Sequence, residues 1–229
     1  MPRKILVITP MKKEMTFFAR VCGVEGFRAK TVMAGRLPVQ VYPHLNLVLA
    51  RGGTGKAQFA VQTQHLLDTD LLPDLVVCAG AAGALAERLN IGDIVVGEST
   101  VEHDIREGFI DRPLPIFEAD ANIVGSLSQV SGDELPFSVH SGIIASGDED
   151  IINDDRRKAL RSSTGAIAAA WEGAGGARAC RFSGVDFVEI RGITDSANAD
   201  AAQDFERNLE LAMGNLARFL TAWIIRSAK

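Results

Sequence analysis

The chain has 229 residues, of which 47% are hydrophobic, and its 24 Lys and Arg against 29 Asp and Glu give a formal net charge of −5. This length and apolar content predict one domain over residues 1–229 with a single substantial core. The mildly acidic balance, without a run of Lys or Arg, argues against a nucleic-acid partner. The longest weakly polar run, 75–86, is interrupted by two glycines and is too short to span a membrane, so we expect a soluble protein.

The cysteines indicate the compartment. Cys22, Cys78 and Cys180 are odd in number and far apart, and no C-x-x-C or Cys/His cluster occurs. This pattern favours reduced, mostly buried thiols in a cytoplasmic protein and gives no sign of a structural zinc site. The first apolar stretch, 5–8, is too short for the core of a signal peptide.

Short apolar runs alternate with longer mixed segments, which is typical of strands and helices in turn. The expected strands are 5–8, 45–49, 75–79, a segment from 93–96 that runs on towards His103, 138–145, 167–170 and 187–193. The expected helices are 12–21, 56–67, one that begins at Asp154 after an Asn153 cap, and 201 to about 225. The region 108–120, with Pro113 and Pro115, is expected to be a surface loop or lid. Because the strands are rich in Val and Ile, we predict an α/β fold with a mainly parallel or mixed sheet covered by helices.

Two glycine-rich segments follow predicted strands, and we expect both to be turns. They are Gly52-Gly-Thr-Gly-Lys56 and Gly80-Ala-Ala-Gly83. The first segment lacks the pattern of a Walker loop, because Ala57 stands where Ser or Thr would bind magnesium and Ala50 replaces the first glycine. It also lacks the dinucleotide-binding pattern, because Gln58 occupies the third glycine position. Two interpretations stay open: the backbone approaches a ligand closely, or the glycines serve only to reverse the chain.

Three carboxylates follow three of the apolar runs, namely Glu14, Glu172 and Asp195. Ligands of such sheets gather beyond the carboxyl ends of the strands, so we hypothesise that the three side chains share one cleft. The residues after Glu172, at 173–177, are too small to cover it. An isolated acid after a strand is more often a helix cap or a solvated charge; Asp195 is a suitable helix cap, and Glu14 is suited to a charged helix face.

Other polar and aromatic residues are weaker candidates. His103 follows a strand, where a lone histidine is more often a structural hydrogen-bonding group than a base. Arg191 alternates with apolar neighbours and is a candidate to pair with an acid such as Glu189 or Glu14 rather than to meet substrate. Trp171 either packs in the core or forms an aromatic floor under a ligand.

Eight short motifs occur in an order that resembles one family. They are Met11-Lys-Lys-Glu14, Gly53-Thr-Gly-Lys56, Gly80-Ala-Ala-Gly83, Ile91-Gly-Asp-Ile-Val-Val96, His103-Asp104, Ser146-Gly-Asp148, Trp171-Glu-Gly173 and Ile193-Thr-Asp195. From about residue 4 to residue 222 the chain resembles the nucleoside phosphorylase superfamily, and within it the 5′-methylthioadenosine/S-adenosylhomocysteine nucleosidases. The resemblance implies a three-layer α/β sandwich whose central mixed, barrel-like sheet is flanked by helices, and assembly as a homodimer or larger oligomer.

The resemblance also implies roles for single residues. Asp195 matches the acid that protonates the purine N7, Glu14 matches the base that activates water, and Glu172 matches the acceptor of the ribose 2′- and 3′-hydroxyls. The positions that match the lining of the substrate pocket are Met11, Gly83, Ile151, Trp171 and Thr194, with Glu172.

The reaction itself requires these residue types. Breaking a ribosyl C–N bond needs an acid for the departing base and a carboxylate that deprotonates water on the opposite face. For Asp195 to act as an acid near neutral pH, its pKa has to be raised by desolvation or proton sharing. No metal and no organic cofactor is needed, and the expected partner is a small-molecule nucleoside.

Three features bear on the nucleophile and the substrate. Glu14 would repel a phosphate dianion, and Ala81 stands where the phosphorylases have a serine. Water is therefore the better nucleophile. Arg51 is a candidate phosphate ligand and keeps phosphorolysis open as an alternative. Asp150 stands where the nucleosidases have an aromatic residue that stacks on adenine, and Trp171 where they commonly have Met. A hydrolase of futalosine or of another modified nucleoside, and a non-catalytic nucleoside-binding relative, remain alternatives.

Overall fold

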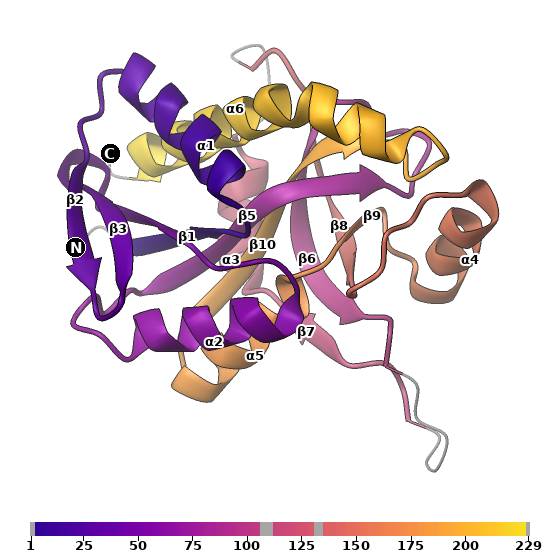
Figure 1. Ribbon diagram of the computed structural model, residues 1–229, viewed down its shortest axis with the longest axis horizontal. Helices are drawn as coiled ribbons and strands as arrows, with labels where there is room; N and C mark the ends of the chain where they lie inside the picture. Colours follow the sequence, from indigo (N-terminus) through magenta and orange to yellow (C-terminus); the bar gives the residue numbers. More distant parts are fainter. Residues whose placement is uncertain (1–2, 106–111, 131–134, 228–229) are drawn as a thin grey trace.

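The computed structural model describes residues 3–105, 112–130 and 135–227 (Figure 1). Its strands are β1 (Ile5–Thr9), β2 (Lys30–Ala34), β3 (Leu37–Tyr42), β4 (Leu47–Arg51), β5 (Leu75–Ala84), β6 (Ile94–Glu102), β7 (Ile116–Glu118), β8 (Val139–Ser146), β9 (Ala168–Ala170) and β10 (Asp186–Asp195). Its helices are α1 (Lys12–Val24), α2 (Lys56–Leu67), α3 (Ala121–Ser128), α4 (Asp154–Thr164), α5 (Gly173–Ser183) and α6 (Ala201–Ser227), with a short 3-10 helix at Pro43–Leu45.

The strands form one mixed sheet that closes on itself over part of its width. Their order is β10-β6-β8-β9-β5-β1-β4-β3-β2, and β10 also pairs with β5, so that β5, β10, β6, β8 and β9 make a closed ring. β7 pairs with β6 outside this path. The pairs β1–β5, β5–β10 and β6–β8 are parallel, whereas β10–β6 and β5–β9 are antiparallel. The mixed, barrel-like sheet predicted by the resemblance is confirmed.

Helices cover both faces of the sheet, which gives the three predicted layers. α1, α3 and α6 pack on one face and α2 with α5 on the other (Figure 1). β1 shows why the central strands are apolar throughout: Ile5 and Val7 face the core under α1 and α6, and Leu6 and Ile8 face the core under α2. Successive side chains of a strand point to opposite faces, so a strand covered on both faces needs apolar residues at every position.

Several boundaries agree with the sequence prediction. α2 spans the predicted residues, and α4 begins at Asp154 after Asn153, whose side chain accepts a hydrogen bond from the Arg156 amide at 2.8 Å. α6 begins at Ala201 as predicted and extends to Ser227. Within the described part of the chain, no helix combines the length and apolar character needed to cross a membrane.

The predicted turn at Gly80–Gly83 is wrong, because these residues lie inside β5, which continues to Ala84. β5 pairs with β10 as far as Gly83 opposite Asp195, and Gly83 also pairs with Ala169 of β9. Closure of the barrel therefore extends the strand through a sequence whose glycines suggested a reversal.

Residues 173–177, for which the sequence indicated only small side chains, form the first half of α5. A Cβ atom on Gly175 would stand 2.2 Å from the carbonyl oxygen of Lys56, so the small residues allow α5 to approach α2 closely. The hairpin of β2 and β3, together with α3 and β7, was not predicted. The predicted loop at 108–120 lies partly outside the described residues, and its described part includes β7.

Candidate active site

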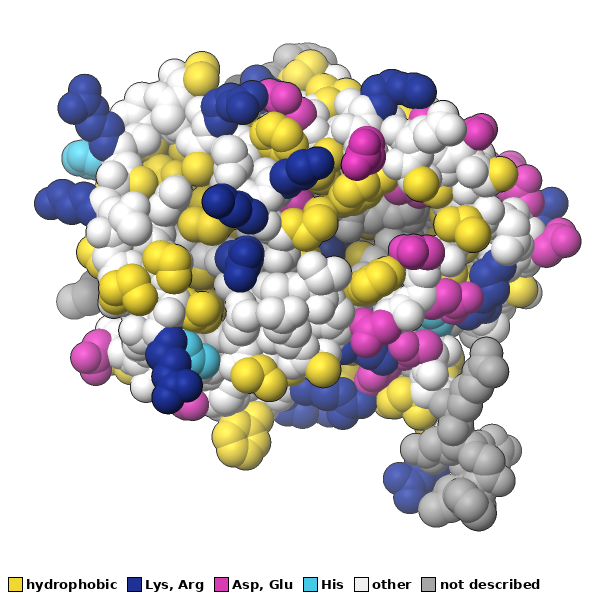
Figure 2. All heavy atoms as spheres, in the orientation of Figure 1, with side chains coloured by type: hydrophobic (Ala, Val, Ile, Leu, Met, Phe, Trp, Pro, Cys, Tyr) yellow, Lys and Arg dark blue, Asp and Glu magenta, His cyan; other side chains and the backbone are white. Residues whose placement is uncertain are grey.

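A cavity of about 680 Å³ lies at the carboxyl ends of β1, β5 and β10. The loop after β8, the end of β9 and the first turns of α6 complete its walls. Six carboxylic acids line it among the described residues, namely Glu14, Glu149, Asp150, Glu172, Asp195 and Glu206. In Figure 2 acidic side chains gather on the right of the view, over α4 and beside the start of α6, with some basic ones among them, and basic side chains are more frequent on the left.

Glu14 is fixed in the cavity by backbone amides. It is the third residue of α1 and is only 1% exposed. One carboxylate oxygen accepts a hydrogen bond from the Met11 amide at the start of the helix, and the other accepts one from the Ala81 amide of β5, each at 2.8 Å. Burial raises the pKa of Glu14 to about 7, and the charge of Glu172 acts in the same direction. The alternative of a charged helix face is wrong for this residue.

Glu172 lies at the start of α5 and is 4% exposed. Its Oε1 accepts a hydrogen bond from the Gly55 amide at 3.2 Å, and its Oε2 lies 3.3 Å from Nη2 of Arg191. Burial raises the pKa of Glu172, and the nearby Arg191 charge opposes that shift. The carboxylate lines the cavity beside the small residues that follow it, and its burial comes from contacts with Gly55, before α2, and Arg191 of β10.

Asp195 ends β10 on the other wall of the cavity and is 8% exposed. Its Oδ1 accepts a hydrogen bond from the Ala197 amide at 2.9 Å, and its Oδ2 accepts one from the Thr194 hydroxyl at 2.8 Å. Burial raises the pKa of Asp195, and the charges of Asp204 and Asp150 add to that shift. α6 begins only at Ala201, so Asp195 is not the cap of that helix.

The two glycine-rich segments lie against the carboxylates of the site. A Cβ atom on Gly80 would stand 2.7 Å from Nη1 of Arg191 and 2.9 Å from Oε1 of Glu14. Gly53 and Gly55 have φ of 80° and 84°, a conformation that only glycine adopts without strain, and it turns the Gly55 amide towards Glu172. The interpretation as chain reversals alone is therefore wrong. These segments bring backbone amides to the site and leave room for its side chains.

The remaining predicted pocket residues lie around the same cavity. Its lining includes all five of them, Met11, Gly83, Ile151, Trp171 and Thr194. The Trp171 indole donates a hydrogen bond to the carbonyl oxygen of Glu149 at 3.1 Å, which fixes the ring on one wall. Sequence reasoning did not assign Phe205 and Gln203 to the site. Phe205 lies in α6, and only the position of this helix beside the strand ends brings it to the cavity.

Arg191 is a buried cation whose partners are already in place. Its Nε donates a hydrogen bond to Glu189 at 2.8 Å, and Nη1 lies 3.3 Å from the Ala81 carbonyl oxygen. The predicted pairing with Glu189 is confirmed, and the second acid is Glu172 rather than Glu14. Burial lowers the pKa of Arg191, but Cys78 and the nearby carboxylates raise it by more, so the guanidinium stays charged.

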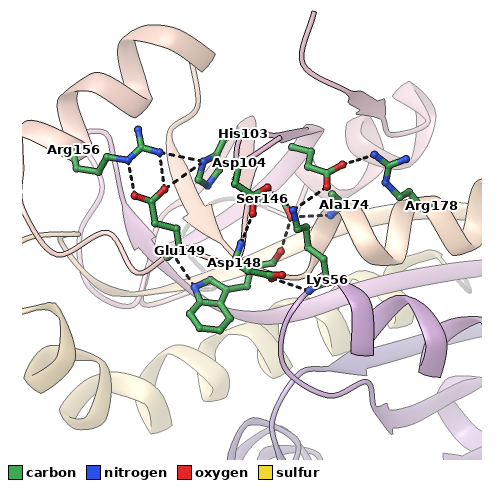
Figure 3. A network of polar contacts seen from close by, with 11 residues as sticks. Lys56, His103, Asp104, Ser146, Asp148, Glu149, Arg156, Ala174 and Arg178 are labelled. Atoms are coloured by element: carbon green, nitrogen blue, oxygen red, sulfur yellow. Dashed lines mark hydrogen bonds and ion pairs between the residues drawn. The ribbon is translucent and has the colours of Figure 1, made fainter. Parts of the chain in front are cut away.

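His103 and Asp104 do not line this cavity; they belong to a neighbouring polar network (Figure 3). Lys56 of α2 forms ion pairs with Asp104 and, at 2.9 Å, with Glu102. The Asp148 amide donates to Asp104 at 2.9 Å, and Arg156 forms an ion pair with Glu149 at 2.6 Å. Burial lowers the pKa of His103. The network holds the loop after β8 against α2, which fits the structural alternative for this histidine.

The described residues contain no group of three or more His, Cys, Asp or Glu side chains suited to a metal ion. The three thiols are all free and buried.

Comparison with known proteins gives the family. The family model of the phosphorylase superfamily matches residues 4–225. A 5′-methylthioadenosine/S-adenosylhomocysteine nucleosidase of an Exiguobacterium strain is 34% identical over 188 residues, 78% of this chain and 80% of that protein. An aminodeoxyfutalosine nucleosidase of Helicobacter pylori is 27% identical over 228 residues, 97% of this chain and 98% of that protein.

Solved structures have the same fold. A 5′-methylthioadenosine/S-adenosylhomocysteine nucleosidase of Neisseria meningitidis, in complex with methylthio-immucillin-A, superposes with a TM-score of 0.84 at 27% identity and covers 97% of this chain and 98% of its own. A futalosine hydrolase of Helicobacter pylori superposes with a TM-score of 0.85 at 25% identity, with 98% of both chains covered. The chain therefore belongs to the phosphorylase superfamily and, within it, to the nucleosidases, which hydrolyse an N-glycosidic bond.

Proposed function

We propose that this enzyme hydrolyses the N-glycosidic bond of a 5′-methylthioadenosine-like purine nucleoside, with Glu14 as base, Asp195 as acid and Glu172 as the ligand of the ribose. The observation that carries the proposal is the convergence of these three carboxyl groups, each buried and each with a raised pKa, on one cavity. Their sequence positions lie far apart and burial of three carboxyl groups together is costly, so this convergence supports a shared function.

Glu14 is suited to activate water. A general base works best when its pKa lies near the working pH, and the pKa of Glu14 is about 7. Each carboxylate oxygen accepts one backbone N–H, from Met11 or Ala81, which leaves a lone pair free on each. The two amides fix the direction in which the base points, so a water molecule can be held ready for attack.

Asp195 is suited to protonate the departing base. Its raised pKa favours the neutral, proton-donating form at a higher pH than for a free aspartate. The Thr194 hydroxyl lies 2.8 Å from Oδ2 and also 3.3 Å from the Ala82 carbonyl oxygen. The hydroxyl can therefore donate to the ionised carboxylate, or turn to Ala82 and accept a hydrogen bond from the protonated acid. Both protonation states keep a partner.

Glu172 is suited to hold the ribose hydroxyls. The Gly55 amide and Arg191 each take one lone pair of its oxygens, and the other lone pairs are available to hydroxyl donors. A negative charge at this position also stabilises the positive charge that develops on the sugar in the transition state. Met11 and Trp171 contact the sugar in this proposal, and Gly83, Ile151 and Thr194 lie towards the base.

Water is the proposed nucleophile. Arg191 is the only arginine or lysine lining the cavity within the described residues, and it is paired with Glu172 and Glu189. Arg51, which kept phosphorolysis open, is exposed and does not line the cavity. A phosphate dianion would therefore meet carboxylates without a free cation. No metal or organic cofactor takes part in this proposal.

A second candidate substrate is aminodeoxyfutalosine. The nucleosidase of Helicobacter pylori that carries this name matches almost the full length of both chains. Asp150 also lines the cavity, in place of the aromatic residue expected to stack on adenine. A carboxylate there changes the contacts offered to the base and its surroundings, so both substrates belong in the same assay.

We further propose that residues 1–229 form one domain, which the family match over 4–225 supports. We also propose a homodimer or larger oligomer, supported by the exposed apolar side chains Ile116 and Ile152, of which Ile152 lines the cavity. Light scattering coupled to size-exclusion chromatography measures the assembly, and a monomeric mass would contradict the proposed oligomer.

We propose the cytoplasm as the compartment of this protein, where the free, buried cysteines would remain reduced.

The test is release of free base from a nucleoside panel containing 5′-methylthioadenosine, S-adenosylhomocysteine, aminodeoxyfutalosine, adenosine and inosine, with and without phosphate. We expect adenine release that does not depend on phosphate. Release that strictly requires phosphate would identify a phosphorylase. Tight nucleoside binding without any release would identify a binding protein.

A further inference from the structure

Glu189 is a buried carboxylate that the proposed mechanism does not use. It lies in β10, is 1% exposed, and is not part of the cavity lining. Its Oε1 accepts the hydrogen bond from Nε of Arg191 at 2.8 Å, and its Oε2 accepts one from the Thr100 hydroxyl of β6 at 2.6 Å. A carboxylate at such a depth is costly unless it is paired and hydrogen-bonded, and here both oxygens are.

The contacts of Arg191 lead from Glu189 to two carboxylates of the cavity. The opposite end of the guanidinium lies 3.3 Å from Glu172 and 3.3 Å from the Ala81 carbonyl oxygen. Ala81 in turn donates its amide to Glu14 at 2.8 Å. The bond from Nε to Glu189 is the shortest contact of this guanidinium, so it does most to set the plane and position of the group.

Glu189 also contributes a negative charge close to the carboxylates of the site. Glu14, Glu172 and Glu189 are three carboxyl groups around Arg191, which is the one buried Lys or Arg among the described residues. The charge of Arg191 favours the ionised forms of Glu14 and Glu172, and the charge of Glu189 opposes this effect at Glu172. A change of charge at Glu189 therefore acts directly on the ionisation of Glu172.

Gly173 shows that the chain is built around this carboxylate. Gly173 directly follows Glu172, and a Cβ atom there would stand 1.9 Å from Oε2 of Glu189. Any other residue at position 173 would displace Glu189 or move the start of α5, which carries Glu172. The glycine therefore provides a second way to perturb Glu189, one that leaves its charge in place.

We propose that Glu189 is a positioning residue of the hydrolytic site, which holds the Arg191 guanidinium against Glu172 and beside Glu14 and places a negative charge behind Glu172. This inference rests on the proposed function of Glu14 and Glu172. The residues that support the site in this proposal, Glu189 of β10 and Thr100 of β6, lie behind the residues that line the cavity.

The test compares Glu189→Gln, Gly173→Ala and Asp93→Asn by the pH dependence of kcat and KM. Glu189→Gln removes the charge with little change in shape, and loss of this charge favours ionisation of Glu172. We therefore expect the acid-side limb of kcat/KM, to which Glu172 contributes as the ligand of the ribose, to move to lower pH by roughly one unit. Gly173→Ala keeps the charge but displaces the carboxylate, so we expect kcat to fall by about tenfold or more and KM to rise. Asp93→Asn alters another buried carboxylate, which binds His140 and lies outside the cavity lining, and should leave the limb in place.

An acid limb in Glu189→Gln that coincides with that of the wild type would overturn the proposal, as would normal kinetics in Gly173→Ala. If either variant does not fold, Thr100→Val removes only the hydroxyl contact to Glu189, and we expect roughly a threefold loss of kcat; wild-type kinetics there would count against the role. If the wild-type enzyme releases no base at all, the proposed function fails separately. The pH dependence of nucleoside binding, measured by calorimetry in wild type and Glu189→Gln, then decides on Glu189, and identical profiles reject it.

Discussion

Gly83 of β5 lies beside Asp195 of β10, and a Cβ atom added to Gly83 would stand 2.8 Å from Oδ1 of Asp195. Asp195 cannot easily give way, because the Ala197 amide holds the same oxygen and the Thr194 hydroxyl holds the other. The absence of a side chain at Gly83 is therefore what leaves room for the proposed acid at the end of its strand.

The first prediction is that Gly83→Ala lowers kcat by roughly one to two orders of magnitude, because misplacement of a catalytic group by a fraction of an ångström is costly. Circular dichroism should show an intact fold. Gly23→Ala is the matched control, since a Cβ atom there meets nothing within 4 Å. Equal activity in the two variants would show that Asp195 tolerates the displacement or plays no part.

The second prediction concerns Asp195 itself. Asp195→Asn removes the proton donor but keeps the shape, so turnover should fall by roughly two to four orders of magnitude while nucleoside binding is retained. Steady-state assays and calorimetry measure the two effects. Asp186→Asn, at the exposed start of the same strand, should behave like wild type. Turnover of Asp195→Asn within a few-fold of wild type would remove this residue from its role.

The third prediction is an acid-side limb set by Glu14. A base acts only when ionised, and the pKa of Glu14 is about 7, so kcat should fall as the pH drops through about 7. Glu14→Gln should lose most of the turnover, and its residual rate should not show this limb. Rate measurements from pH 5 to 9 in buffers of constant ionic strength provide the test. An unchanged limb in the variant would assign it to another group.

The fourth prediction concerns the alkaline side. Asp204 and Asp150 both raise the pKa of Asp195, so replacing either with Asn should lower that pKa. Asp195 acts as an acid and has to be protonated, so the alkaline limb of kcat should move to lower pH in Asp204→Asn and in Asp150→Asn.

Asp68→Asn, after α2 on another side of the sheet, is the control for this pair of variants. A shift to higher pH, or none in either variant, would contradict the assignment of the alkaline limb to Asp195.

Sequence patterns over a few residues correctly predicted the elements whose formation depends on neighbouring residues. The apolar run at 5–8 is buried on both faces, and α4 begins where Asn153 caps it, because burial and capping act over a few residues. The glycines at 80 and 83, by contrast, led to the wrong prediction of a turn. Their local preference is for turns, but pairing with β9 and β10 imposes an extended strand, and side chains from distant segments occupy the space that the glycines leave.

For the candidate site, the order and residue types of the motifs were enough to bring Glu14, Glu172 and Asp195 forward as a set. The sequence could not establish what holds them, namely the Ala81 amide on Glu14 and the Gly55 amide on Glu172. These partners lie tens of residues from the groups they contact, and their meeting depends on the closure of the barrel.

The sequence by itself thus determined the fold class, the family and the three candidate acids, because apolar periodicity and motif order are written along the chain. Only the tertiary structure decided the electrostatics. Burial and neighbouring charges raise the pKa values of all three carboxyl groups, and both depend on what the folded chain packs around each group rather than on its neighbours in sequence.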